Sequence, residues 1–163
     1  MSDVQIRELE NGDEAAVLDA YRDAFGHARD AAAWRWAFTS HPLGRRVMLA
    51  VRQGTVLAQY AALPVRVWID GEAQVFGQVV DTFVRRSLRE GLGGSRLLVR
   101  TAEAFFETHG EDTFMWGSDF PHSDSTWPDS RSVIEKNLAG IPEAVARKVV
   151  CENVAKLYGI DLD

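Results

Sequence analysis

The sequence predicts an α/β (α+β) fold with a central mixed, mostly antiparallel sheet, flanking helices and a C-terminal two-helix tail. Between residues 46 and 85, apolar residues recur with a period of two and are interrupted by glycine-containing turns. A glycine-rich stretch at 91–94 then leads into an amphipathic helix that ends near His109. From about residue 129 to 158 the apolar spacing is again helical, which predicts the tail.

A strand and two helices are expected before the sheet. Residues 4–9 alternate between apolar and polar and predict the first strand. A helix follows with Asp13 as its candidate N-cap, and Gly26 ends it. A second helix over about Asp30–Thr39 is rich in aromatic residues, so part of it must be packed.

The sheet residues predict two consecutive hairpins. Strands at 47–51 and 55–60 are joined at Gln53-Gly54, and Pro64 bends the second strand or marks an edge. After the turn at Asp70-Gly71, a further strand is expected from about Ala73 to Arg85. The result is an antiparallel sheet of three strands with the first strand at one side.

Beyond the helix that ends near His109, Thr113–Trp116 reads as a short buried strand that leads into a polar loop with Asp119 and His122. Loops at the carboxyl ends of strands commonly carry the chemistry of α/β folds. One tail helix is expected from Asp129 or Ser130 to about 138 and a second from Pro142 to about 158.

Composition limits the partners that are expected. The chain has 163 residues, 46% of them hydrophobic, with a net charge of −6 and a pI near 5.2. This acidic balance argues against nucleic acid and anionic membranes as partners. The single cysteine, Cys151, excludes an internal disulfide framework, and no apolar stretch is long enough to span a membrane. A cytoplasmic protein is expected.

The glycine-rich stretch is a candidate anion-binding site. A glycine-rich connection before a helix exposes backbone N–H groups at the positive end of the helix dipole. Three glycines lie within residues 91–94, and Arg85, Arg86 and Arg89 precede them. A tight turn without a ligand is the alternative interpretation.

Residues 4 to 115 resemble the GCN5-related N-acetyltransferase (GNAT) family in the order of their predicted elements and in the Gly91-Leu-Gly93 motif. The resemblance implies acetyl-CoA as cosubstrate and a small-molecule or other amine as acceptor. It also implies that the backbone of Phe83 and Val84 pairs with pantetheine, and that the following loop holds the pyrophosphate. The implied cofactor-binding residues are Phe83, Val84, Arg89, Gly91, Leu92, Gly93, Gly94 and Ser95.

An acetyltransferase needs a group that removes a proton from the ammonium form of its acceptor. Asp81 lies on the predicted fourth strand near the expected site, where burial could raise its pKa. A structural, hydrogen-bonded aspartate is the alternative. Tyr21, Tyr60 and Ser118 are further polar candidates.

From Met115 onward the sequence resembles the C-terminal end of amidohydrolase-related metal-dependent hydrolases. The resemblance rests on Trp116-Gly-Ser-Asp-Phe-Pro-His122, on Ser125-Thr-Trp-Pro128 and on residues 151–159. It implies that Asp119 binds a divalent metal such as zinc or handles a proton, with His122 nearby. A catalytic metal needs about three protein ligands, and the family's other histidine positions are absent here.

Three functions therefore remain open. The first is an N-acetyltransferase-like domain at residues 1–115, incomplete at its C-terminal end, with an amidohydrolase-like helical segment at 116–163. The second is a metal-dependent hydrolase or decarboxylase. The third is a non-catalytic fusion of two partial domains, in which unpaired sheet edges would favour a homodimer.

Overall fold

A computed structural model describes residues 3–69, 71–89, 92–109, 114–122, 125–139 and 141–162. The chain divides into two compact units, Met1–His109 and Gly110–Asp163. Three residues of the predicted turns and motifs, Asp70, Gly91 and Thr113, lie outside the described part, and so do the side chains of Leu92 and Ser95. None of the helices in the described part combines the length and the apolar character needed to span a lipid bilayer.

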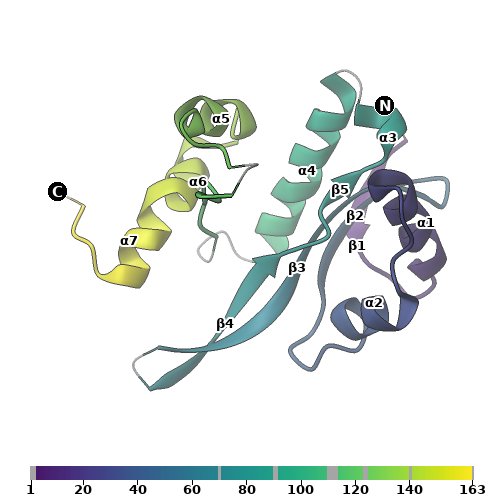
Figure 1. The fold of residues 1–163 in the computed structure, drawn as a ribbon, viewed down its shortest axis with the longest axis horizontal. Coiled ribbons are helices and arrows are strands. Elements are labelled where there is room, and N and C mark those ends of the chain that lie inside the picture. The colour runs from purple at the N-terminus through teal and green to yellow at the C-terminus, as the bar shows by residue number, and fades with distance from the viewer. Residues whose placement is uncertain are drawn as a thin grey trace. The chain divides into compact units, whose positions relative to one another are not determined.

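The first unit is built on a five-stranded sheet (Figure 1). Its strand order is β1-β2-β3-β4, and β5 also pairs with β3. Each pairing among the described strands is antiparallel, and β1 lies at one edge, which confirms the predicted hairpins and the place of the first strand. The strands are β1 (Gln5–Glu8), β2 (Arg46–Arg52), β3 (Thr55–Ile69), β4 (Glu72–Val79) and β5 (Phe83–Val84).

Helices cover both faces of this sheet. They are α1 (Glu14–Phe25), α2 (Ala31–Phe38), α3 (Arg86–Arg89) and α4 (Leu92–His109). The predicted ends of the first two helices are confirmed, because Gly26 adopts φ 81° after α1 and the Asp30 side chain accepts a hydrogen bond from Ala33 N. Asp13 is the N-cap residue of α1, as predicted, but its side chain makes no capping hydrogen bond and instead binds Arg7 through both carboxylate oxygens.

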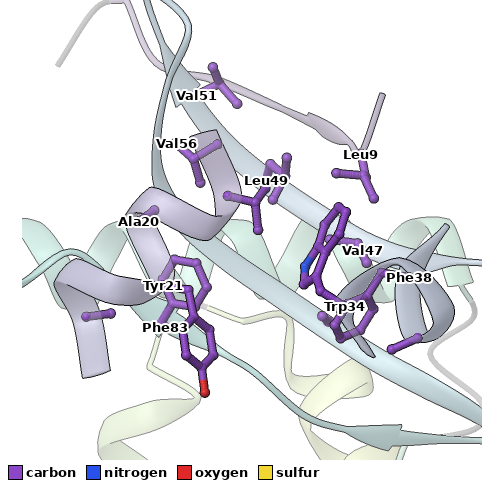
Figure 2. Packing of buried hydrophobic residues seen from close by; sticks show 14 residues of the cluster. Leu9, Ala20, Tyr21, Trp34, Phe38, Val47, Leu49, Val51, Val56 and Phe83 are labelled. Atoms are coloured by element: carbon purple, nitrogen blue, oxygen red, sulfur yellow. The ribbon is translucent and has the colours of Figure 1, made fainter. Parts of the chain in front are cut away.

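The α1–α2 face of the sheet holds the larger apolar cluster (Figure 2). Trp34 and Phe38 of α2 pack there on β2, and both side chains are almost fully buried. On the other face, Leu97 of α4 packs on Ala58 and Val84. The predicted α/β class with flanking helices is confirmed.

β3 is the longest strand, and it continues without interruption through Pro64. Pro64 lies opposite Gly77 of β4, whereas the described pairing of β3 with β2 ends at Ala62, which agrees with the predicted edge position. The continuous strand predicted from Ala73 to Arg85 is wrong. It is interrupted at residues 80–82, and the pairing register with β3 moves by one residue across the interruption. This extra residue makes a β-bulge between β4 and β5.

The second unit is helical among its described residues. It contains α5 (Ser130–Asn137), then α6 (Glu143–Arg147), a π-helical segment (Lys148–Glu152) and α7 (Asn153–Tyr158). The last three follow one another directly, so the predicted two-helix tail is present. The predicted strand at Thr113–Trp116 is wrong for its described residues, because Phe114–Trp116 is not a strand. The Phe114 carbonyl accepts from Asn153 Nδ2 instead, and Trp116 N donates to the Val149 carbonyl.

Candidate functional site

The β-bulge places Asp81 at the interruption between β4 and β5. Its backbone adopts φ 51°, a conformation that is uncommon for residues other than glycine. The Asp81 carbonyl accepts a 2.8 Å hydrogen bond from Nε2 of Gln59, a fully buried side chain of β3. A long-range hydrogen bond thus holds the aspartate in the bulge.

The Asp81 carboxylate is mostly buried and faces one cation. Its Oδ2 lies 2.9 Å from Arg29 Nη2, and 13% of the Asp81 side chain is exposed. Burial raises the pKa of the Asp81 carboxyl, and the Arg29 guanidinium opposes that shift. A carboxylate with a raised pKa is suited to take up a proton near neutral pH.

Several buried polar atoms near the bulge have no hydrogen-bond partner among the described residues. They are Arg29 Nε, Gln59 Oε1, Asp81 Oδ2 and Thr82 Oγ1. Asp81 Oδ2 still forms an ion pair with Arg29 Nη2 at 2.9 Å, but the alignment of the two groups does not meet the geometry of a hydrogen bond. Buried polar groups in native proteins are almost always paired, so this cluster indicates a place where a ligand or water supplies the partners.

Aromatic side chains lie beside this cluster. Tyr21 and Phe25 of α1 both contact the ring of Phe83, with centroid distances of 6.1 and 6.0 Å. The Arg29 guanidinium lies 5.6 Å from the centre of the Tyr21 ring. The bulge is therefore bordered by an apolar wall on the α1 side. Tyr21, a polar candidate from the sequence, belongs to this wall.

The backbone of Val84 faces away from β3. Arg85 N donates to the Leu57 carbonyl, and hydrogen-bonded and non-hydrogen-bonded residues alternate in an antiparallel pair. The N–H and C=O of Val84, one residue earlier, therefore point to the other side. Its carbonyl accepts a hydrogen bond from Arg89 Nε at 3.1 Å, which leaves the N–H as the group that the edge offers to a ligand.

Arg89 has a structural role, because its side chain binds two backbone carbonyls. Besides Val84, its guanidinium donates to the Ala24 carbonyl at 2.8 Å and so joins the end of α1 to β5. The sequence predicted a glycine-rich loop from Arg89 to Ser95 directly after a strand. In the structure α3 comes first, and the residues from Leu92 onward already belong to α4, so that prediction is wrong.

The two described glycines of this stretch have opposite surroundings. A Cβ at Gly93 would meet no atom within 4 Å, whereas one at Gly94 would overlap the Leu88 carbonyl oxygen. Gly93 borders a pocket of about 150 Å³ whose other lining residues are Val4, Arg52, Leu57, Leu88, Arg96, Leu97 and Arg100. The first turn of α4 therefore presents open space and nearby cations at Gly93. Close packing occurs at Gly94.

The remaining candidates lie elsewhere. Tyr60 packs on Phe105 and Phe106 of α4, and burial raises its pKa to about 12, so its phenol stays protonated. Ser118 belongs to the second unit, where its carbonyl accepts from Ser125 Oγ.

Asp119 and His122 form an exposed pair in the second unit. His122 Nδ1 lies 3.0 Å from Asp119 Oδ2, and about two-thirds of each side chain is exposed. No group of three or more His, Cys, Asp or Glu side chains that could hold a metal ion occurs in the described part of the chain. The described residues therefore do not provide the donor set of a catalytic zinc site.

Sequence reasoning missed three residues of the bulge: Arg29, Gln59 and Thr82. No local pattern singles them out. Arg29 comes directly before the N-cap of α2. Gln59 is a single polar residue in a mainly apolar strand, which is common in any sheet. The pairing of β3 with β5 brings Gln59 to Asp81, and the connection between α1 and α2 brings Arg29, whereas Thr82 directly follows Asp81 in the sequence.

Two family models match the chain, and their ranges overlap at residues 97–120. A family model described as "Acetyltransferase (GNAT) domain" matches residues 5–120, and one described as "Amidohydrolase" matches residues 97–160. A search of curated proteins gave no match.

Solved structures with similar folds have low sequence identity. One is a probable N-acyltransferase from Enterococcus faecalis V583, with 15% identity over 65% of this chain and 27% of that chain, and a TM-score of 0.48. Another is a GCN5-related N-acetyltransferase from Kribbella flavida, with 18% identity, 66% and 28% coverage, and a TM-score of 0.47. This chain thus spans about a quarter of the length of each.

A GNAT family acetyltransferase from Staphylococcus aureus has 12% identity, with 65% of this chain and 80% of that chain covered, and a TM-score of 0.46. The match to the acetyltransferase family model covers well over half of the chain. On the strength of that match over residues 5–120, the chain belongs to the GNAT acetyltransferase family.

Proposed function

We propose that this chain transfers an acetyl group from acetyl-CoA to an amine, with the reaction at the β-bulge. The observation that carries the proposal is the cluster of buried, unpaired polar atoms around Asp81, next to the outward-facing N–H of Val84. Membership of the GNAT family supports acetyl-CoA as the cosubstrate. The acceptor is an amine of a small molecule or a protein.

The bulge residues fit the binding of the thioester arm. The N–H of Val84 can donate to an amide carbonyl of pantetheine, as a neighbouring strand would. The first turn of α4 at Gly93, with Arg96 close by, offers backbone N–H groups and positive charge to the pyrophosphate. Leu92, Gly94 and Ser95 contribute through the backbone of the same turn.

Asp81 acts as the general base in this proposal. Its carboxylate takes one proton from the ammonium form of the acceptor, and the freed amine attacks the carbonyl carbon of the thioester. A C–N bond forms and the C–S bond breaks, and the second nitrogen proton goes to the departing CoA thiolate. Arg29 must share or release Asp81 when the acceptor enters, because the two side chains are paired at 2.9 Å.

Binding of the cosubstrate is tested first. Isothermal titration of the full chain with acetyl-CoA should show binding. Gly93→Phe should abolish that binding, because the large side chain would block the approach of the pyrophosphate. The variant should still fold, because the space at Gly93 is open. Gly93→Ala is the matched control and should bind more nearly like the natural chain. Absence of binding by the natural chain would refute the proposal.

The role of Asp81 is tested separately. Asp81→Asn should keep acetyl-CoA binding and lower kcat by about 10²–10⁴-fold in an assay of CoA release with a panel of amines. Activity of the natural chain should fall as the pH drops below the pKa of Asp81, and the residual activity of Asp81→Asn should not show this decrease at low pH. Unchanged turnover in Asp81→Asn would exclude Asp81 as the base.

For the second unit we propose a non-catalytic segment derived from an amidohydrolase-like sequence, fused to the acetyltransferase-like part near residue 115. The partial family match at residues 97–160 supports the origin. The alternative of a metal-dependent hydrolase rests on Asp119 and His122, which are two exposed donors. Stoichiometric zinc or manganese in the purified protein would favour that alternative.

A further inference from the structure

The outer edge of β4 pairs with no other strand in the described part of the chain. β4 is the last strand in the described sheet order, and most of its residues are exposed. Proteins normally protect such edges with lysine, proline, a bulge or a covering segment. Within Glu72–Val79, however, Glu72 is the one charged residue, and the sequence has neither lysine nor proline there.

The hydrogen-bonding pattern identifies the backbone groups at this edge. Val80 N donates to the Ala61 carbonyl, so the residues of β4 with even numbers pair with β3. The N–H and C=O groups of the odd-numbered residues, Ala73, Val75 and Gly77, consequently point outward from the sheet. They form a regular row that another strand can join.

This row is complementary to itself. When two copies of β4 meet antiparallel about a two-fold axis at Val75, Val75 lies opposite Val75, and Ala73 lies opposite Gly77. The same register places Glu72 opposite Gln78, so a carboxylate meets an amide that can donate a hydrogen bond. Like charges do not meet in this register. We propose that β4 of a second copy of this chain occupies the edge and that the chain forms a two-fold dimer through a continuous sheet.

The side chains beside the edge support this occupant. Trp68 of β3 lies next to Ala73 on the α4 side of the sheet and is 68% exposed. Val75 and Val79 lie on the same face and are partly exposed as well. In the proposed dimer the indole would lie over Ala73 toward Gly77 of the second copy, where two small residues leave room for it. The tip of the β3–β4 hairpin extends away from α1 and α4 (Figure 1).

Cross-linking tests the register. In the full chain with Cys151→Ser, Val75→Cys should form a disulfide-linked dimer on mild oxidation, because directly paired residues have Cα atoms about 5.5 Å apart. Ala73→Cys is the matched control, on the same strand and face. Its two copies would be four residues out of register and should not cross-link. Equal cross-linking of both variants, or none in Val75→Cys, would overturn the proposal.

A charge-swap experiment tests the interface without oxidation. Light scattering and sedimentation should show a concentration-dependent dimer for the natural chain and for Val75→Thr. Val75→Lys and Val75→Glu should each weaken dimerisation at least tenfold, because like charges then lie opposite each other. An equimolar mixture of the two should form dimers again. A natural chain that stays monomeric, or a mixture that fails to pair, would refute the two-fold pairing at Val75.

Discussion

Replacing Gly94 by alanine should destabilise the first unit, whereas the same change at Gly93 should not. A Cβ at Gly94 would lie 2.8 Å from the Leu88 carbonyl carbon and 3.4 Å from Arg89 Cα, and it would overlap the Leu88 carbonyl oxygen. These are backbone atoms of α3, so no side chain can rotate away to make room. The junction between α3 and α4 must open instead.

The expected magnitude follows from two opposing effects. Overpacking of a close contact costs about 1–3 kcal/mol, and occasionally more. Alanine in a helix gains up to about 1 kcal/mol over glycine. Gly94→Ala should therefore lose about 1–2 kcal/mol, while Gly93→Ala, with no atom within 4 Å, should be neutral or slightly stabilised.

Thermal and urea unfolding followed by circular dichroism provide the measurement. A loss of 1 kcal/mol corresponds to roughly 4–8 °C in a domain of about 100 residues. Gly94→Ala should therefore melt clearly below both Gly93→Ala and the natural chain. Equal melting temperatures for the two variants would show that the α3–α4 junction is not packed as described, and that the contrast between the two glycines is wrong.

Two further predictions concern titratable groups. Burial lowers the pKa of His109 below 6.5, so the folded chain binds fewer protons than the unfolded chain, and the free energy of unfolding should fall as the pH drops below 6.5. In urea unfolding between pH 7 and 5, His109→Phe should make the free energy of unfolding depend less on pH. An unchanged pH dependence in the variant would contradict this. The paired guanidinium of Arg7 lowers the pKa of Asp13, so Asp13→Asn should cost about 1–2 kcal/mol at pH 7. That cost should shrink as the pH falls below about 3.8, the usual pKa of the carboxyl, and a cost that is equal at pH 7 and pH 3 would show that the ion pair is not its source.

Local patterns predicted much of the first unit. At the first hairpin, Gln53 and Gly54 both adopt positive φ, 50° and 74°, as a two-residue turn between strands of alternating pattern requires. The end of α1 at Gly26 and the start of α2 at Asp30 were likewise predictable. Each depends on residues within one turn of the feature, which is why the sequence alone was sufficient.

Features that depend on distant residues were not predictable in this way. The bulge is held by Gln59, which is 22 residues from Asp81 in the sequence. Phe114–Trp116 has the apolar character of a buried strand, but its partner is Asn153 in a helix rather than a neighbouring strand. A short apolar run has no feature that distinguishes these two surroundings.

The candidate site likewise combines features that depend on nearby residues with features that depend on distant ones. Asp81 was a candidate because of its predicted place on the fourth strand, whereas no sequence pattern pointed to Arg29, the cation that it faces. Arg89 was expected to flank an anion site, yet its guanidinium is used by the carbonyls of Val84 and Ala24, the latter 65 residues away. A side chain that binds two backbone carbonyls, one of them far away in the sequence, cannot be recognised from neighbouring residues.

The bulge also reverses the parity of the strand. Before it, odd-numbered residues such as Val79 face α4; after it, Phe83 faces the α1 cluster and Val84 faces α4. One added residue therefore decides which of two neighbouring side chains enters which half of the core. If the same residues 80–82 formed a regular strand without the bulge, the phenyl ring of Phe83 would face α4 and the smaller Val84 would face Tyr21. The number of residues between β4 and β5 therefore determines which side chains enter each half of the core, just as the identity of those side chains does.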